Sequence, residues 1–292
     1  MNLAELSGVL LAISVAAGML GSLLGLGGGF VVVPVLTLFF HLDIRLAIGT
    51  SIVAVAATSS AAAARNVSGS ITNLRIAVSL ALATTLGAVT GALLAGVFGT
   101  RFLFALFGIV LGLSGAQMLR RRSAPTRAAD AETGVSKTLA RHGLRGGQLA
   151  DRLSLHSAYY DEAEGVEVPY AVVHAGLGLG LMYVAGTVSG LLGIGSGALK
   201  VPAMDLAMHV PMKVSTATSN LLIGMTAAAS AVIFFARGDV DPLIAGPVAL
   251  GVMLGATHGS KLLLRIRADR LRLLFVVALV VVAAEMLWKG VG

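Results

Sequence analysis

The sequence predicts an all-α polytopic membrane protein built from two homologous repeats, and two observations on composition and patterning support the membrane class. Only 12% of the 292 residues are charged and 57% are hydrophobic, with a mean hydropathy of +0.91. Soluble domains usually carry about 25% charged residues, so this chain has too little polar surface to cover a soluble globule. Successive apolar runs near the roughly 20 residues that cross a bilayer as helix fill residues 3–119 and 170–288. The shorter alternation of a transmembrane β-barrel is not seen, so helices are predicted.

The third observation is an internal repeat. Shifted by 168 residues, the separation of Pro34 and Pro202, the chain matches itself over a long ungapped stretch. The string "GLGGGFVVVP" at 25–34 then meets "GIGSGALKVP" at 193–202. Each half divides into five apolar pieces, of which the second is too short for an ordinary span. The pieces are 6–24, 28–40, 45–64, 75–98 and 102–119, then 171–192, 196–208, 213–235, 242–262 and 271–288.

These pieces divide the chain into three parts. Residues 1–119 form the first transmembrane repeat, 120–169 a polar linker and 170–292 the second transmembrane repeat. Within the linker, strand-like runs at Leu153–Tyr160 and Val166–Tyr170 flank an acidic turn, which predicts a small β-hairpin.

The cations indicate how often each half changes sides of the membrane. With four changes per half, the loops on one side hold 12 cations and those on the other hold 8. With five changes the split is 16 to 4, which is the asymmetry that the positive-inside rule expects. We therefore predict inverted repeats with about four full-length helices and one short broken segment each, a cytoplasmic linker and both termini outside. Residues 1–24 lack the positive start of a secretory signal and are interpreted as the first span.

The glycine-rich breaks predict a binding site. Irregular backbone is tolerated inside a membrane only where it is buried in protein or lines a wet cavity. A helix that begins after such a break presents unpaired N–H groups and a partial positive charge, which favour anions. Paired interrupted segments in inverted repeats are typical of a transporter's binding site.

Hydroxyl and amide groups near the start of the third piece of each half add donors to this predicted site. Plain capping and interhelical hydrogen bonding remain the alternative for each of them. The expected substrate-binding residues are Gly27, Gly28, Gly29, Thr50, Ser51, Gly195, Ser196, Gly197, Lys200, Thr218, Ser219 and Asn220.

Lys200 is the one cation deep inside an apolar piece, and its repeat counterpart is Val32. Such a group costs about 2.5–3.5 kcal/mol on insertion scales and usually faces a cavity or a partner. Two interpretations stay open: Lys200 neutralises an anionic substrate, or it pairs with Asp205.

Several functions are excluded by what the sequence lacks. No cysteine is present, so disulfides and thiolate metal sites are excluded. The glycine strings lack the third glycine of a dinucleotide fingerprint, no GK[ST] follows them, and no HExxH occurs. We expect no enzyme activity, no cofactor and no metal. The cations flank apolar runs, which is typical of membrane orientation and not of nucleic-acid binding. Small-residue ridges at Gly87 and Gly91 and at Gly251 and Gly255 predict close helix packing.

At these motifs the sequence resembles the TauE/SafE family of sulfite and sulfonate exporters. The resemblance rests on "GLGGGFVVVPVL", "AIGTS" and "GSIT", on the mirrored "GLLGIGSGALKVPAMD" with "KVSTATSNLLIG", and on the "LGAVTGALL" and "LGATHGSKLL" pair. It covers nearly the whole chain except the linker. It implies a non-enzymatic multi-pass protein of the cell membrane that carries small sulfur-containing or organic anions, usually outward.

We therefore expect a secondary-active permease that exports small anions, sulfite or organosulfonates in particular. One alternative is a cation- or proton-coupled permease that depends on Asp205 or Glu285; another is a membrane interaction protein that docks through the linker. The partners expected are the substrate and the lipid bilayer. The substrate, transport direction, coupling ion and any homo-oligomer are left open.

Overall fold

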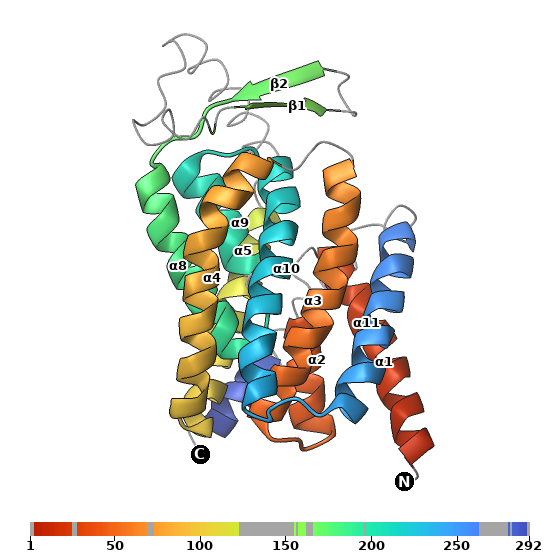
Figure 1. The fold of residues 1–292 in the computed structure, drawn as a ribbon. Coiled ribbons are helices and arrows are strands. Elements are labelled where there is room, and N and C mark those ends of the chain that lie inside the picture. The colour runs from red at the N-terminus through yellow and green to blue at the C-terminus, as the bar shows by residue number, and fades with distance from the viewer. Residues whose placement is uncertain are drawn as a thin grey trace.

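The computed structural model describes residues 3–24, 28–68, 73–122, 155, 157–161, 166–195, 197–262, 280 and 282–290. Within these ranges the protein is mostly helical, as predicted, with one two-stranded sheet (Figure 1). The first half holds α1 (Leu3–Leu24), α2 (Gly29–Pro34), the π-helix η1 (Val35–Phe39), α3 (Ile44–Ser68), α4 (Leu74–Val97) and α5 (Thr100–Arg122). The linker holds β1 (Ser157–Asp161) and β2 (Val166–Tyr170). The second half holds α8 (Ala175–Leu192), α9 (Gly197–Pro202), η2 (Ala203–Ala207), α10 (Met212–Ala236) and α11 (Pro242–Leu262), and residues 282–290 are helical.

Three of the described helices are long and apolar enough to cross a membrane, namely Leu74–Val97, Ala175–Leu192 and Val214–Ala236. Shorter apolar helices account for five further expected pieces, including Gly29–Phe39 for the first short one. The second short piece, 196–208, holds α9 and η2. Most of the last expected piece, 271–288, lies outside the described residues. The helical membrane class is therefore confirmed.

The two broken segments, α2 with η1 and α9 with η2, have the same internal construction. In each, six α-helical residues end at a proline, and five residues of π-helix follow. Proline removes one backbone hydrogen bond and crowds the carbonyl four residues before it, so the regular α-helix ends there. Both segments then close with equivalent backbone bonds of 3.1 Å, Leu42 N–H to Leu36 O and Val210 N–H to Met204 O. The repeat seen in the sequence is thus present in local structure.

Six helices follow one another as a row in the order α8, α4, α10, α3, α11 and α1 (Figure 1). Read from its two ends, the row pairs equivalent helices of the two halves: α8 with α1, α4 with α11, and α10 with α3. The centre of the row is therefore the contact between α3 and α10. In Figure 1, α3 runs toward the end that carries the hairpin, and α10 runs away from it.

Glycines bring the outer helices of the row into backbone contact. A Cβ at Gly186 of α8 would overlap Thr84 O of α4, and a Cβ at Gly18 of α1 would overlap Val252 O of α11. These two contacts are equivalent under the 168-residue shift. Only a small residue permits such an approach. In a membrane, close van der Waals packing of this kind drives helix association, because the hydrophobic effect that water provides for soluble proteins is absent.

The glycines of the predicted small-residue ridges also bring helices into backbone contact. A Cβ at Gly87 would overlap Tyr183 O, and a Cβ at Gly255 would overlap Val15 O, again at equivalent positions. The close packing predicted for Gly87 and Gly255 is confirmed.

Replacing Gly186 with alanine should destabilise the α4–α8 pair. The added methyl group meets backbone atoms that cannot rotate away, and overpacking of this kind costs about 1–3 kcal/mol. Gly180→Ala in the same helix is the matched control, because no described atom lies within 4 Å of a Cβ there. The control should leave stability unchanged or raise it by about 0.5–1 kcal/mol. Melting temperatures in detergent measure both, and equal temperatures for the two variants would contradict the packing.

The hairpin and the chain termini lie at opposite ends of the molecule (Figure 1). β1 and β2 pair antiparallel, with Ser157 opposite Tyr170 and Asp161 opposite Val166. Leu155, just before β1, and Tyr170, at the end of β2, are buried in an apolar cluster with Ile76 and Leu80 of α4. The base of the hairpin is therefore packed onto the helices.

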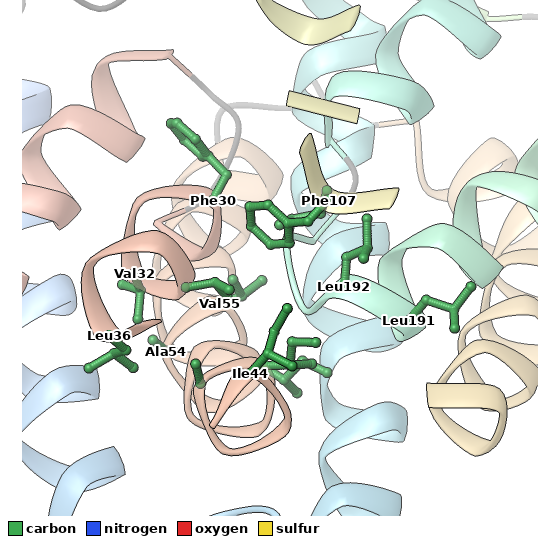
Figure 2. Close-up of a cluster of buried hydrophobic side chains, with 14 of the residues drawn as sticks. Phe30, Val32, Leu36, Ile44, Ala54, Val55, Phe107, Leu191 and Leu192 are labelled. Atoms are coloured by element: carbon green, nitrogen blue, oxygen red, sulfur yellow. The ribbon is translucent and has the colours of Figure 1, made fainter. Parts of the chain in front are cut away.

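A larger apolar cluster fills the centre of the molecule. Figure 2 shows Phe30, Val32, Val55, Phe107 and Leu192, which α2, α3, α5 and α8 contribute to this cluster. The first broken segment contributes Phe30 and Val32 to this cluster, while the second contributes Ala203 and Met204 to the cluster under the hairpin.

Candidate functional site

The two glycine breaks meet on α3. Ser51 is fully buried, and its Oγ donates to Gly193 O at 2.8 Å, with Gly29 O at 3.2 Å as a second acceptor. A Cβ at Gly29 would lie 2.6 Å from both Gly193 O and Ser51 Oγ. The break of the second half thus touches the start of the broken segment of the first. The Ser51 proton is used within the protein, on carbonyl oxygens that would repel an anion.

Gly195 lies where the faces of α3 and α10 approach each other. Its φ of +73° is in the left-handed region that favours glycine. A Cβ there would lie 2.9 Å from Val55 Cγ1 and 3.0 Å from Ile223 Cγ2, which are equivalent residues of α3 and α10. The second break is therefore wedged between the central helices of the row.

Two predicted site residues carry buried hydroxyls with no hydrogen-bond partner among the described residues. They are Thr50, which is fully buried, and Ser219, which is 1% exposed. Most buried polar groups are paired, and an unpaired one costs about 1–3 kcal/mol. Thr218 next to Ser219 differs, because its Oγ1 accepts from the backbone N–H of Asn73 at 3.3 Å. Thr50 and Ser219 therefore keep donors that the fold does not use.

Lys200 of α9 is completely buried. Its Nζ donates to Thr226 Oγ1 of α10 at 2.9 Å. An ammonium has three donors, and this bond uses one of them. Within the described residues Lys200 makes no ion pair with Asp205, so the pairing that the sequence left open is not formed. The charge faces a neutral hydroxyl.

The equivalent positions of the first half carry no charge. Val32 takes the place of Lys200; it is 2% exposed and belongs to the apolar cluster of Figure 2. Thr58 takes the place of Thr226, and its Oγ1 donates to Ala54 O at 3.0 Å on its own helix. The two halves thus share a threonine at this level, but only the second half adds a cation.

The remaining predicted residues are placed as follows. Gly28, Gly195 and Gly197 are buried, Asn220 is half-buried, and Gly27 and Ser196 lie outside the described residues. A Cβ at Gly28 would lie 2.5 Å from Val252 Cγ1, so this glycine permits close packing of α2 on α11. Among the residues that the structure describes, no group of three or more His, Cys, Asp or Glu is placed to hold a metal ion.

Sequence reasoning missed Thr226, although the signal is present in the sequence. The 168-residue shift that pairs Ser51 with Ser219 also pairs Thr58 with Thr226, seven residues further along each helix. Positions seven apart lie on one helix face. The two threonines could therefore have been assigned to the same faces as the two serines.

Sequence reasoning also missed Asn73, which connects the linker to α10. Its Oδ1 caps α4 at Ile76 N (3.0 Å), while its Nδ2 donates to the Tyr170 hydroxyl at 2.7 Å. Burial raises the pKa of Tyr170, which keeps this phenol neutral. Since the N–H of Asn73 also reaches Thr218, one residue links the hairpin, α4 and the predicted site. The sequence does indicate Asn73 as a helix cap, because an asparagine just before an apolar piece is a typical N-cap residue.

Comparison with known proteins identifies the class of the chain. The family profile described as "Sulfite exporter TauE/SafE" matches residues 10–286. The "Probable membrane transporter protein YunE" of Bacillus subtilis (strain 168) is 26% identical over 97% of this chain and 98% of its own length. A "Probable membrane transporter protein" of Xylella fastidiosa (strain 9a5c) is 27% identical over 94% of each chain. No solved structure matches.

The family profile spans both repeats, the linker and every predicted site residue. The family is one of membrane transporters and not of enzymes, which confirms the non-enzymatic class expected from the sequence. The protein is therefore a multi-pass membrane transporter that belongs to the sulfite exporter TauE/SafE family.

Proposed function

We propose that the protein is a secondary-active transporter that exports small anions, sulfite or organosulfonates in particular, across the cell membrane. Family membership supports a transported small molecule. The substrate class is supported by the description of the family and by the charge of the predicted site.

The observation that carries the proposal is the buried cation in the second broken segment. Lys200 is fully buried, its described partner is the neutral Thr226 hydroxyl, and no described carboxylate neutralises it. Intramembrane charges are expensive and usually mark a substrate or ion path. An anionic substrate supplies the opposite charge, and it accepts hydrogen bonds from the remaining ammonium donors.

Unused hydroxyls on the two central helices offer further hydrogen-bond donors to an oxyanion. Thr50 and Ser219 are buried without partners, and they lie on the two central helices α3 and α10. Sulfonate and sulfite oxygens accept hydrogen bonds from such donors. We assign Lys200, Thr50 and Ser219 to substrate binding, and Ser51 and Gly29 to the contact that holds the two breaks together.

We further propose that the two repeats are inverted, with the linker in the cytoplasm. The reversed directions of α3 and α10 support the inversion (Figure 1). The cations support the orientation, because Arg45, Arg101, Arg237 and Lys289 lie in segments at the end of the molecule that carries the termini. The other sixteen cations apart from Lys200 are those assigned to the linker side. Positive charge concentrates on cytoplasmic loops.

Labelling of single cysteines in intact cells tests this orientation. The chain has no cysteine of its own, so each variant carries one target. Gly99→Cys, in the exposed turn between α4 and α5, should react with a membrane-impermeant maleimide added from outside. Ser157→Cys in the exposed part of β1 should react only after permeabilisation. The reverse pattern would place the linker outside and overturn the proposed orientation.

Transport into liposomes tests the function. Purified protein should mediate saturable uptake of ³⁵S-sulfite or of a radiolabelled alkanesulfonate, and protein-free liposomes should not. Uptake of an amino acid cation by the same proteoliposomes serves as the negative control. Failure to move any small anion, under conditions where the protein remains folded, would overturn the proposal.

A further inference from the structure

Thr226 of α10 is the described hydrogen-bond partner of the Lys200 ammonium of α9, and it fixes the position of that ammonium. Thr226 Oγ1 accepts from Lys200 Nζ at 2.9 Å, and the threonine hydroxyl has Leu222 O (2.9 Å) and Ile223 O (3.1 Å) as acceptors on its own helix. Because the hydroxyl proton is used by α10, its oxygen can only accept from the lysine. The bond therefore holds one ammonium hydrogen against α10 and leaves two for other acceptors.

We infer that Thr226 is a positioning residue that orients the Lys200 ammonium toward the substrate, and that this pair limits the site to anions with one negative charge. This inference rests on the proposed function of the site. It adds Thr226 to the site and narrows the substrate class from small anions to monoanions, so that sulfite is carried as hydrogensulfite and not as the dianion.

The limit on charge follows from the asymmetry between the repeats. In the first half, Thr58 is equivalent to Thr226 and bonds its own helix in the same way. The position equivalent to Lys200, however, is Val32, which carries no charge. Among the cations whose burial the structure describes, Lys200 is the one that is buried. One buried cation offsets one negative charge, and a second negative charge would stay uncompensated inside the membrane, which is expensive.

Three variants separate a positioning role from a structural one. Thr226→Val keeps the shape but removes the oxygen that accepts from Lys200, and Thr226→Ser restores it. Thr58→Val is the matched control, because it removes an equivalent threonine that bonds only its own helix. We expect Thr226→Val to raise the KM for methanesulfonate about tenfold, the effect of losing a bond to a charged group. Vmax, and the KM values of Thr226→Ser and Thr58→Val, should stay near the wild type.

Melting temperatures of the three variants exclude a loss of structure as the cause. All three should unfold cooperatively above the assay temperature; Thr226→Val should melt below Thr58→Val, because it also leaves a buried ammonium without its described partner, and Thr226→Ser should recover the loss. Equal KM values for Thr226→Val and Thr58→Val would overturn the positioning role.

The charge limit is tested on the unmodified protein. Methanesulfonate and ethane-1,2-disulfonate share one functional group, and both are fully ionised near neutral pH, so they differ in charge without titration. The disulfonate should compete with methanesulfonate uptake about 100-fold more weakly than unlabelled methanesulfonate does. Equal competition would overturn the charge limit while leaving the proposed function intact. A wild-type protein that carries neither sulfonate nor sulfite would instead overturn the proposed function, and this inference with it.

Discussion

Lys200→Met should abolish saturable anion transport and leave the protein as stable as the wild type or more stable. The lysine is buried, its positive charge meets no described carboxylate, and its Nζ bonds only a threonine. Replacing buried charges with apolar side chains of similar volume is often neutral or stabilising by about 1–4 kcal/mol. A residue retained for folding would show the opposite effect on stability.

Val32→Met is the control for this variant, because it places the same side chain at the equivalent position of the first half. Uptake of ³⁵S-sulfite into proteoliposomes and melting temperature in detergent are measured on both. Normal uptake by Lys200→Met, or a large fall in its melting temperature, would contradict the assignment of Lys200 to the substrate.

Gly195→Ala should strongly destabilise the centre of the molecule, because it combines a backbone penalty with crowding. The φ of +73° costs an alanine about 1–2 kcal/mol, and the new Cβ would lie 2.9–3.0 Å from Val55 and Ile223. Overpacking adds about 1–3 kcal/mol. Because Gly195 is wedged between α3 and α10, the substitution should also disturb the Lys200 segment two residues further on and reduce transport.

Gly238→Ala separates the two costs. Its φ is +77°, but no described atom lies within 4 Å of a Cβ there, so it carries the backbone penalty alone. The difference in melting temperature between the two variants measures the crowding at the break. If both variants melt and transport alike, the tight contact of the second break with the central helices is wrong.

The described repeat and its element boundaries were largely predictable, because both depend on local signals. Prolines and glycines at a constant separation defined the broken segments, and apolar runs defined the helices to within a few residues. The π-helices after Pro34 and Pro202 were not predictable, since their hydrogen-bond pattern has no signature in composition.

Side-chain partners were harder to predict than elements. The sequence left Lys200 with two interpretations, since Asp205 is five residues away and was the nearest acid in the same segment. The partner in the structure, Thr226, comes from a different helix. Which helix faces α9 depends on the order of helices in the row, and that order is a property of tertiary packing.

Ser51 and Ser219 show the same limit. They are equivalent in sequence and received the same predicted role, but Ser51 bonds two backbone carbonyls while Ser219 has no described partner. A repeat aligns residue types and says nothing of where the two copies differ in their contacts. The differences in contacts between the halves therefore could not be predicted from the sequence. The exception is the position where the first half has Val32 and the second half has Lys200.

Direct binding of an anion to purified protein tests the central claim most directly. ³⁵S-sulfite or radiolabelled methanesulfonate is titrated onto wild-type protein, Lys200→Met and Val32→Met in detergent, without any membrane gradient. We expect saturable binding to the wild type and to Val32→Met, and none to Lys200→Met. Equal binding to all three proteins would contradict a site centred on Lys200, and absence of binding to the wild type would contradict the anion site itself.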